Sequence, residues 1–214
     1  MSTLFRRVLY FNRHIALPAA VVVTCLLMQS CGKKDFSRLP SIGKDHLFMM
    51  VVEIPAGKNK KTEFNPTTKE FETNQVNGSD RIIDFLAYPC NYGFIPSTMQ
   101  NKAEGGDGDP LDVMLISESI PTGSVVKIIP VAVLHLTDNG ETDDKIIAIP
   151  ADPFARTINA IDYSSLSTRY PSIIQIIELW LQNYKGTGII QPVKWGDEAD
   201  ATSTIIKSGT DKQK

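Results

Sequence analysis

An acidic turn that leads into an apolar strand is the stretch that most constrains how this chain can fold. Asp107, Asp109 and Asp112 fall within six residues, and the glycine and proline between them disfavour a helix and favour a tight turn. Residues 111–116 are otherwise apolar and predict a buried strand. Like charges packed this closely are costly unless a cation lies between them. The turn therefore predicts a divalent cation bound through oxygen ligands.

The same turn has two alternative interpretations. It could be a solvated surface turn that binds nothing, because a short acidic pattern alone is a weak signal. An EF-hand loop is excluded, because Leu111 takes the fifth position, Asp112 replaces the turn glycine and Pro110 interrupts the loop. Glu118 does fall at the twelfth position of such a loop. From these residues alone, the cation site and the solvated turn both remain open.

The N-terminal residues have the pattern of a secretory signal. Three arginines precede residue 14, and residues 15–28 form an uncharged apolar run that is too short to predict a membrane span. Ser30 and Cys31 follow this run and resemble a bacterial lipoprotein cleavage site. We expect residues 1–30 to be a lipoprotein-type signal peptide and Cys31 to carry the lipid. The alternative is an ordinary signal peptide with an incidental cysteine.

The remaining chain predicts one exported domain. We expect residues 31–45 to form a tether, 46–208 the folded domain and 209–214 a frayed tail. The formal charge of −2 gives no basic excess, so nucleic acid is not an expected partner. Cys90 is the cysteine left without a role, so no intrachain disulfide is expected. The expected location is the bacterial cell envelope, with membrane attachment through the lipid anchor only.

The apolar pattern predicts short strands first and helices later. Helices are expected at 173–184, with Ser172 as the N-cap and Gly186 as the stop, and at 197–207. The order indicates an α+β domain whose strands close into a barrel. The expected strands are 47–54, 61–65, 71–76, 111–116, 125–136 and 145–149.

A second acidic cluster lies between the last two expected strands. It consists of Asp138, Glu141, Asp143 and Asp144, and Lys145 follows at once. Alone, it is typical of a solvated hairpin loop. Together with the first turn it could hold two or more metal ions, which can clamp the attacking and leaving oxygens of a phosphoryl transfer. Side chains that could contact phosphate oxygens are Lys61, Arg81, Lys145, Lys185, Tyr88, Tyr92 and Tyr184.

Two runs of sequence resemble the soluble inorganic pyrophosphatases of family I. Residues 88–96 read Tyr-Pro-Cys-Asn-Tyr-Gly-Phe-Ile-Pro, and residues 107–113 read Asp-Gly-Asp-Pro-Leu-Asp-Val, the signature of that family. The similarity extends from about Val51 to Trp195. It implies a five-stranded OB-like β-barrel with flanking helices, and hydrolysis of pyrophosphate to two phosphates with several Mg²⁺ ions per site. We also expect a homo-oligomer.

The resemblance implies a role for each site residue. Asp109 would be the catalytic base that accepts a proton from the attacking water. Many relatives carry an acid where this chain has Asn139, and the loss of that acid would weaken metal binding. The segment from Arg81 to Tyr88 is also one residue shorter than in typical relatives. Metal would be bound by Asp107, Asp112, Asp138, Asp143 and Glu53. Substrate would be bound by Lys61, Arg81, Tyr92, Lys145, Tyr184 and Lys185, with Glu63 and Tyr88 in support.

Two other functions are consistent with the same residues. One is a surface protein that binds metal and phosphate without turnover. The other is a hydrolase of a related substrate, such as short polyphosphate or a nucleotide. Every position of the implied catalytic set is filled, which favours the enzyme, and no sequence feature indicates a pocket for a nucleobase.

Overall fold

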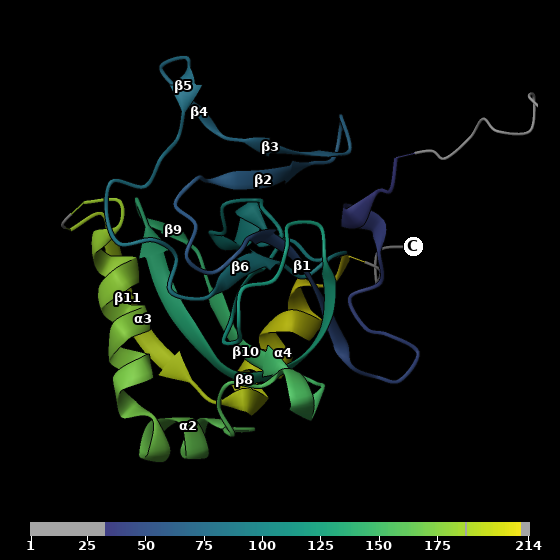
Figure 1. Ribbon diagram of the computed structural model, residues 1–214, viewed down its shortest axis with the longest axis vertical. Coiled ribbons are helices and arrows are strands. Elements are labelled where there is room, and N and C mark those ends of the chain that lie inside the picture. Colours follow the sequence, from purple (N-terminus) through teal and green to yellow (C-terminus); the bar gives the residue numbers. More distant parts are fainter. Residues whose placement is uncertain (1–32, 187, 211–214) are drawn as a thin grey trace, which may run out of the picture. The chain divides into compact units, whose positions relative to one another are not determined.

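Five β-strands form a closed ring in the computed structural model, which describes residues 33–186 and 188–210 (Figure 1). Each strand pairs with the next, and the fifth pairs again with the first. The pairs are antiparallel except for one parallel pair, β7 with β10. This ring confirms the predicted α+β fold with a five-stranded, OB-like sheet. In ring order the strands are β1 (Phe48–Ile54), β6 (Asn91–Phe94), β7 (Asp112–Leu115), β10 (Lys145–Pro150) and β8 (Val125–Asp138).

Shorter strands extend or flank the ring. The expected strand at 71–76 is wrong in its extent, because it is divided between β3 and β4 at Asn74. There the backbone turns away to bond Lys61 and Arg81 at 2.8 and 2.7 Å. Two short hairpins consist of β2 (Thr62–Asn65) with β3 (Glu70–Thr73), and β4 (Gln75–Val76) with β5 (Ser79–Asp80). Both β9 (Glu141–Thr142) and β11 (Ile190–Gly196) pair with β8.

The helices follow most of the strands along the chain, as expected. In α3, Pro171 occupies the first turn and Tyr170 is the N-cap, so the expectation that Ser172 caps this helix is wrong. Proline suits this position because its fixed φ is already helical. Asp197 caps α4 by accepting hydrogen bonds from two backbone N–H groups. The α-helices are α2 (Tyr163–Arg169), α3 (Pro171–Asn183) and α4 (Glu198–Ser208), and the 3₁₀ turns are η1 (Phe36–Arg38), η2 (Lys102–Glu104) and η3 (Pro153–Ala155).

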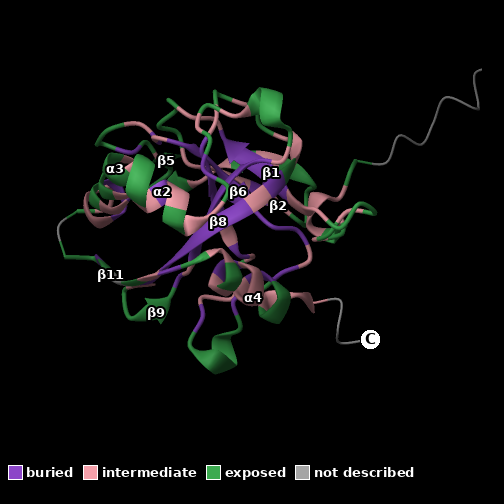
Figure 2. Cartoon of the chain, turned by 90° about the horizontal axis from the view of Figure 1, so that it is seen from below, coloured by how far each residue is buried: buried purple, intermediate pink, exposed green. Residues whose placement is uncertain are grey.

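The hydrophobic core lies on both faces of the strands. Along β10, Ile147 and Ile149 pack in a cluster with α3, whereas Ile146 and Ala148 pack in a second cluster with α4. Successive side chains of a strand point to opposite faces, so both faces of β10 are covered. Figure 2 shows the consequence, since the strands of the ring are largely buried while α3 and α4 each expose one face.

The segment that precedes β1 lies against the domain. The Phe36 ring contacts the Phe64 and Phe71 rings edge-on, with centroids 5.4 and 5.2 Å apart. The Ser97 N–H and hydroxyl donate to the carbonyls of residues 37 and 39 at 3.0 and 2.9 Å. Part of the expected tether is therefore packed structure, because its aromatic side chain buries apolar area. The compact unit begins at Lys34.

The chain ends bear on three other expectations. Thr210 N–H donates to the Ser97 carbonyl at 2.9 Å, so the first part of the expected frayed tail is held to the domain. The expected signal peptide of residues 1–30 and the expected lipid attachment at Cys31 lie outside the described residues. In the parts of the chain that the structure describes, no helix has the length and hydropathy to cross a membrane.

Candidate active site

One cavity of about 530 Å³ collects most of the expected site residues. It is bounded by residues of strands β1, β2 and β6 to β10, by the acidic turn and by the end of α3. Twelve expected residues line it: Glu53, Lys61, Glu63, Tyr92, Asp107, Asp109, Asp112, Asp138, Asp143, Lys145, Tyr184 and Lys185.

The parallel pairing of β7 with β10 brings the two acidic segments together. Asp112 is the first residue of β7 and Lys145 the first of β10, and they are register partners. Parallel strands begin at the same edge of a sheet, so the segments that precede them, with Asp107 in one and Asp143 in the other, meet there. All four side chains line the cavity.

Lys145 is the central cation of the cavity. Its side chain is 2% exposed and its ammonium group donates to both Asp112 and Asp143. The Tyr92 hydroxyl donates to the same oxygen of Asp112 at 2.6 Å. Burial alone would lower the pKa of Lys145, but the two carboxylates raise it above its ordinary value. Lys145 is therefore charged throughout the neutral pH range, as a buried ammonium with two anionic partners should be.

The acidic turn is organised by its own backbone. Asp109 N–H donates to the Asp107 carboxylate at 2.9 Å, and Gly108 has a φ of 88°, which glycine adopts at little cost. Burial, together with nearby carboxylates, raises the pKa of Asp107 and of Asp109. After burial, the charges of Asp112 and Glu63 raise the pKa of Asp109 most, and the charge of Lys61 opposes them. The turn therefore concentrates negative charge at the cavity.

Glu53 and the pair of Lys61 and Glu63 form another wall. Glu53, on β1, is 7% exposed and accepts the Phe64 N–H at 2.7 Å. Burial, and then the charges of Asp112 and Glu63, raise its pKa well above the ordinary value. Lys61 forms an ion pair with Glu63 at 2.7 Å. This wall thus offers one buried carboxyl group beside one ion pair.

The end of α3 supplies a tyrosine and a lysine. The Tyr184 ring stacks on Trp180, with centroids 4.4 Å apart and 6° between the planes. The neighbouring Lys185 forms an ion pair with Asp138. Burial, and then the charge of Asp143, raise the pKa of Tyr184, so its hydroxyl keeps its proton and can donate a hydrogen bond.

Two expected site residues do not line the cavity. Tyr88 is 2% exposed and packs behind the wall, with its ring 5.3 Å from Tyr92 and 4.5 Å from Trp180. Arg81 also lies outside the lining, although its charge acts on Tyr88 and Tyr184. Phe94, from the 88–96 run, and Glu141, from the second acidic cluster, also line the cavity. So do three residues that no motif marks: Ser37, Phe64 and Pro66.

The net charge of the cavity indicates that an anionic ligand would need cations beside it. Eight carboxylates and three lysines line it, which leaves five formal negative charges. A small polyanion would be repelled unless cations entered with it. Carboxylate oxygens are the ligands that Mg²⁺ prefers, so the chemistry of the donor set fits this ion. Within the described ranges, no three acidic, cysteine or histidine side chains already form a group that could hold a metal ion. Lys145 and Lys185 instead contact three of the carboxylates.

The fold and the site together define a class of protein. A closed barrel carries a cavity in which carboxylates can hold cations while lysines and tyrosines can contact anionic oxygens. A family model described as inorganic pyrophosphatase matches residues 50–213. The chain belongs to the family I inorganic pyrophosphatases.

Individual relatives match over most of the chain. The inorganic pyrophosphatase of Neisseria meningitidis serogroup B is 36% identical over 180 residues, which are 81% of this chain and 94% of that protein. That of Haemophilus influenzae is 36% identical and covers 74% of this chain and 85% of its own length. The crystal structure of the Neisseria gonorrhoeae enzyme has a TM-score of 0.66 at 30% identity, covering 83% of this chain and 98% of its own.

Proposed function

We propose that the cavity is the active site of an inorganic diphosphatase that hydrolyses pyrophosphate to two phosphates. The observation that carries this proposal is the convergence of both acidic segments with Lys61, Lys145 and Lys185 on one cavity, in a chain of the pyrophosphatase family. Pyrophosphate is a small polyanion, and its oxygens suit ammonium and hydroxyl donors.

The carboxylates of the cavity would hold Mg²⁺, several ions per site. Asp107, Asp112 and Asp143 lie at the shared edge of β7 and β10 and would be the principal ligands, with Asp138 and Glu53 binding further ions. Bound Mg²⁺ would supply two effects, an increased acidity of the attacking water and compensation of charge on the phosphate oxygens.

Asp109 would be the general base. Burial and the charges of Asp112 and Glu63 raise its pKa. A raised pKa makes the ionised carboxylate a stronger proton acceptor. Its position between two proposed metal ligands, Asp107 and Asp112, supports this role, since the water that must lose a proton would be bound by the ions that they hold.

Lysines, tyrosines and one arginine would hold the phosphates. Lys61 lines the cavity beside Glu63, and Tyr184 and Lys185 line it from the end of α3. Charge builds up on the leaving phosphate during bond cleavage, and fixed positive groups lower the cost of that charge. Tyr92, Lys145 and, from outside the lining, Arg81 would complete this set.

The proposal is tested by measuring phosphate release from pyrophosphate with and without Mg²⁺. Asp109→Asn keeps the size of the side chain and removes its basicity, so kcat should fall about 10²–10⁴-fold. Asp84→Asn, at an exposed aspartate outside the cavity, is the matched control and should keep the wild-type rate. A wild-type protein without Mg²⁺-dependent release would contradict the enzyme, and full activity of Asp109→Asn would contradict the assigned base.

Two alternatives have the same binding residues. A protein that binds metal and phosphate without turnover would bind a non-hydrolysable pyrophosphate analogue in the presence of Mg²⁺ and release no phosphate from pyrophosphate. A hydrolase of polyphosphate or nucleotides would release phosphate faster from those substrates than from pyrophosphate.

We further propose that the enzyme is exported, anchored to the membrane of the bacterial cell envelope through a lipid on Cys31, and assembled as a homo-oligomer. The arginines, the apolar run and the Ser30-Cys31 junction support the anchor. Cys31→Ser should move the protein from the membrane fraction to the aqueous fraction. Unchanged retention in the membrane fraction would contradict the anchor, and light scattering of the purified protein tests the oligomer.

A further inference from the structure

Gln100 contacts the acidic turn through its backbone. Its N–H donates to the Asp109 carbonyl and its own carbonyl accepts the Gly108 N–H, both at 2.8 Å. These two bonds hold the turn on either side of the proposed base. Any residue except proline at position 100 can form them, because they use only main-chain atoms.

The loop that follows Gln100 is shaped for this contact. A Cβ atom at Gly106 would lie 2.5 Å from the carbonyl carbon of Gln100 and 2.6 Å from its oxygen, which is closer than atoms can approach. Thr142 N–H donates to the Gly105 carbonyl at 2.8 Å, so the loop also contacts β9. Residues 100–106 therefore lie between the two acidic segments.

The side chain of Gln100 reaches the second acidic segment. Its Oε1 accepts the Asp144 N–H at 2.7 Å, and its Nε2 donates to the Asp143 carboxylate at 3.5 Å. A carboxylate only accepts and an N–H only donates, so the two partners fix the orientation of the amide group. Gln100 is 7% exposed, which makes both bonds costly to lose.

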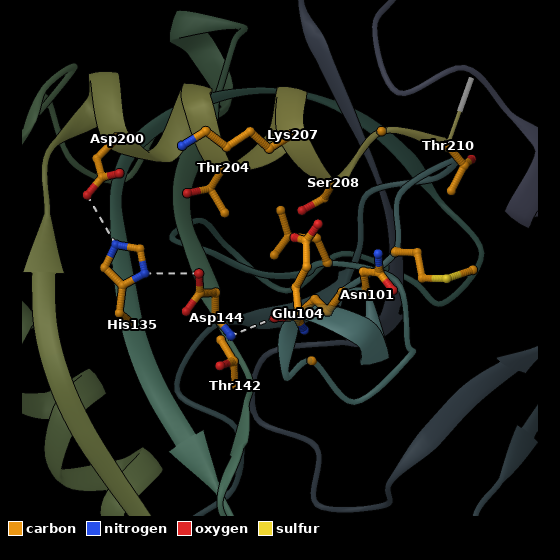
Figure 3. Close-up of a pocket in the computed structure, with 15 residues that line it drawn as sticks. Asn101, Glu104, His135, Thr142, Asp144, Asp200, Thr204, Lys207, Ser208 and Thr210 are labelled. Carbon is orange, nitrogen blue, oxygen red and sulfur yellow. Dashed lines mark hydrogen bonds and ion pairs between the residues drawn. The ribbon is translucent and has the colours of Figure 1, made fainter. Parts of the chain in front are cut away.

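Gln100 does not line the catalytic cavity. It lines a separate cavity, also of about 530 Å³, beside α4. Asp144 lines this second cavity as well, and His135 lies between Asp144 and Asp200, at 2.9 and 3.1 Å (Figure 3). Asp143 and Asp144 are neighbours that face different cavities. Gln100 contacts both of them and would not touch the substrate.

We propose that Gln100 is a positioning residue for the reaction, which aligns Asp143 with the acidic turn so that carboxylates of both segments can hold the same ions. This inference rests on the proposed function. Apart from Gln100, the Asp143 carboxylate contacts Lys145, a group that we assign to the substrate phosphates. Hydrogen-bond partners of metal ligands commonly set metal affinity, and their loss costs about 10–100-fold.

The side-chain bonds from Gln100 to Asp143 and Asp144 form what we call the Gln100 bridge. Gln100→Met tests this bridge, because methionine has a similar volume and neither a donor nor an acceptor of comparable strength. The main-chain bonds to the turn should persist. Asn101→Ala is the matched control, since among the described residues the side chain of Asn101 bonds only Ala103 N–H, within the same loop. Gln100→Ala is the second variant, used if methionine does not allow folding.

The first readout is amide hydrogen exchange in the metal-free protein. Gln100→Met should speed exchange at the Asp144 amide about 10-fold or more, because its acceptor is removed, and leave Gly108 unchanged. Asn101→Ala should leave both amides unchanged. Equal protection of Asp144 in wild type and Gln100→Met would overturn the proposed bridge.

The second readout is Mg²⁺ affinity, measured by calorimetry without substrate and as the Mg²⁺ concentration for half-maximal activity. Both should shift about 10-fold to higher concentration in Gln100→Met, with kcat largely recovered at saturating Mg²⁺. Unchanged affinity would overturn the positioning role. An inactive wild-type protein would contradict the proposed function instead. Hydrogen exchange and calorimetry do not need activity, so they would still test the role of Gln100.

Discussion

Asp112 and Lys145 lie opposite each other at the start of two parallel strands, and the lysine joins this aspartate to Asp143. We therefore expect the pair to have two functions. It neutralises buried carboxylates in the metal-free protein, and it places an ammonium group where we expect a phosphate to bind.

Replacing this lysine should destabilise the protein in a way that metal can reverse. Lys145→Met leaves Asp112 and Asp143 without their buried cation, and removing one partner of a buried ion pair costs about 3–5 kcal/mol. We expect the free energy of unfolding, measured by urea denaturation without metal, to fall by this amount. Added Mg²⁺ should restore more stability in Lys145→Met than in wild type. A variant as stable as wild type without metal would contradict the role of this pair.

Mg²⁺ should stabilise the wild-type protein even without substrate. The lining of the cavity has a net formal charge of −5, so we expect cations to bind the folded state in preference to the unfolded chain. A ligand at a concentration 100 times its dissociation constant adds about 2.7 kcal/mol to the free energy of unfolding. This raises the melting temperature by several degrees. Thermal scans with Mg²⁺, and after its removal by a chelator, measure the shift. Equal melting temperatures would mean that the cavity binds no ion in the absence of substrate.

His135 should make stability depend on pH. Burial lowers its pKa, but hydrogen bonds and charge from Asp200 and Asp144 outweigh burial and raise it above 6.5. The stabilisation by His135 is therefore complete below pH 6.5 and is lost as the pH rises through the folded-state pKa. His135→Gln should lose more stability, relative to wild type, at pH 6 than at pH 9. His46→Gln, at an exposed histidine, is the control, and an equal loss at both pH values would contradict the prediction.

The N-terminal segment should contribute to stability and to the cavity. Phe36→Ala removes a half-buried ring from contact with Phe64 and Phe71. We expect the free energy of unfolding to fall by about 1–3 kcal/mol. Ser37 lines the catalytic cavity, so KM should also rise. Phe154→Ala is the matched control, because Phe154 is 99% exposed. Unchanged stability and KM in Phe36→Ala would show that the segment is held only loosely.

The α+β fold and most of the residues that line the cavity could be predicted from the sequence. The acidic residues could be identified because they are close in sequence, and the patterns at 88–96 and 107–113 place them in a family. Helices α3 and α4 follow from their apolar periodicity to within two residues at either end. These features depend on neighbouring residues, so local rules are sufficient for them.

Features that depend on distant pairings could not be predicted from the sequence. The ring closes where Phe48 pairs with Ile128, and no local signal marks that register. Gln100 lies in a polar loop, and its role depends on both acidic segments being in place. Phe36 lies in a segment with the composition of a tether, and only the positions of Phe64 and Phe71 explain its burial. Tertiary contacts outweighed local composition at each of these residues.

The pairing of β8 with β11 sets the order in which the enzyme can become active. The end of β8 carries Asp138, which pairs with Ile190, and Tyr184 and Lys185 also come late in the chain. A chain appears from its N-terminus during synthesis. The cavity therefore lacks one wall until most of the polypeptide has emerged, so we expect a nascent chain to be inactive.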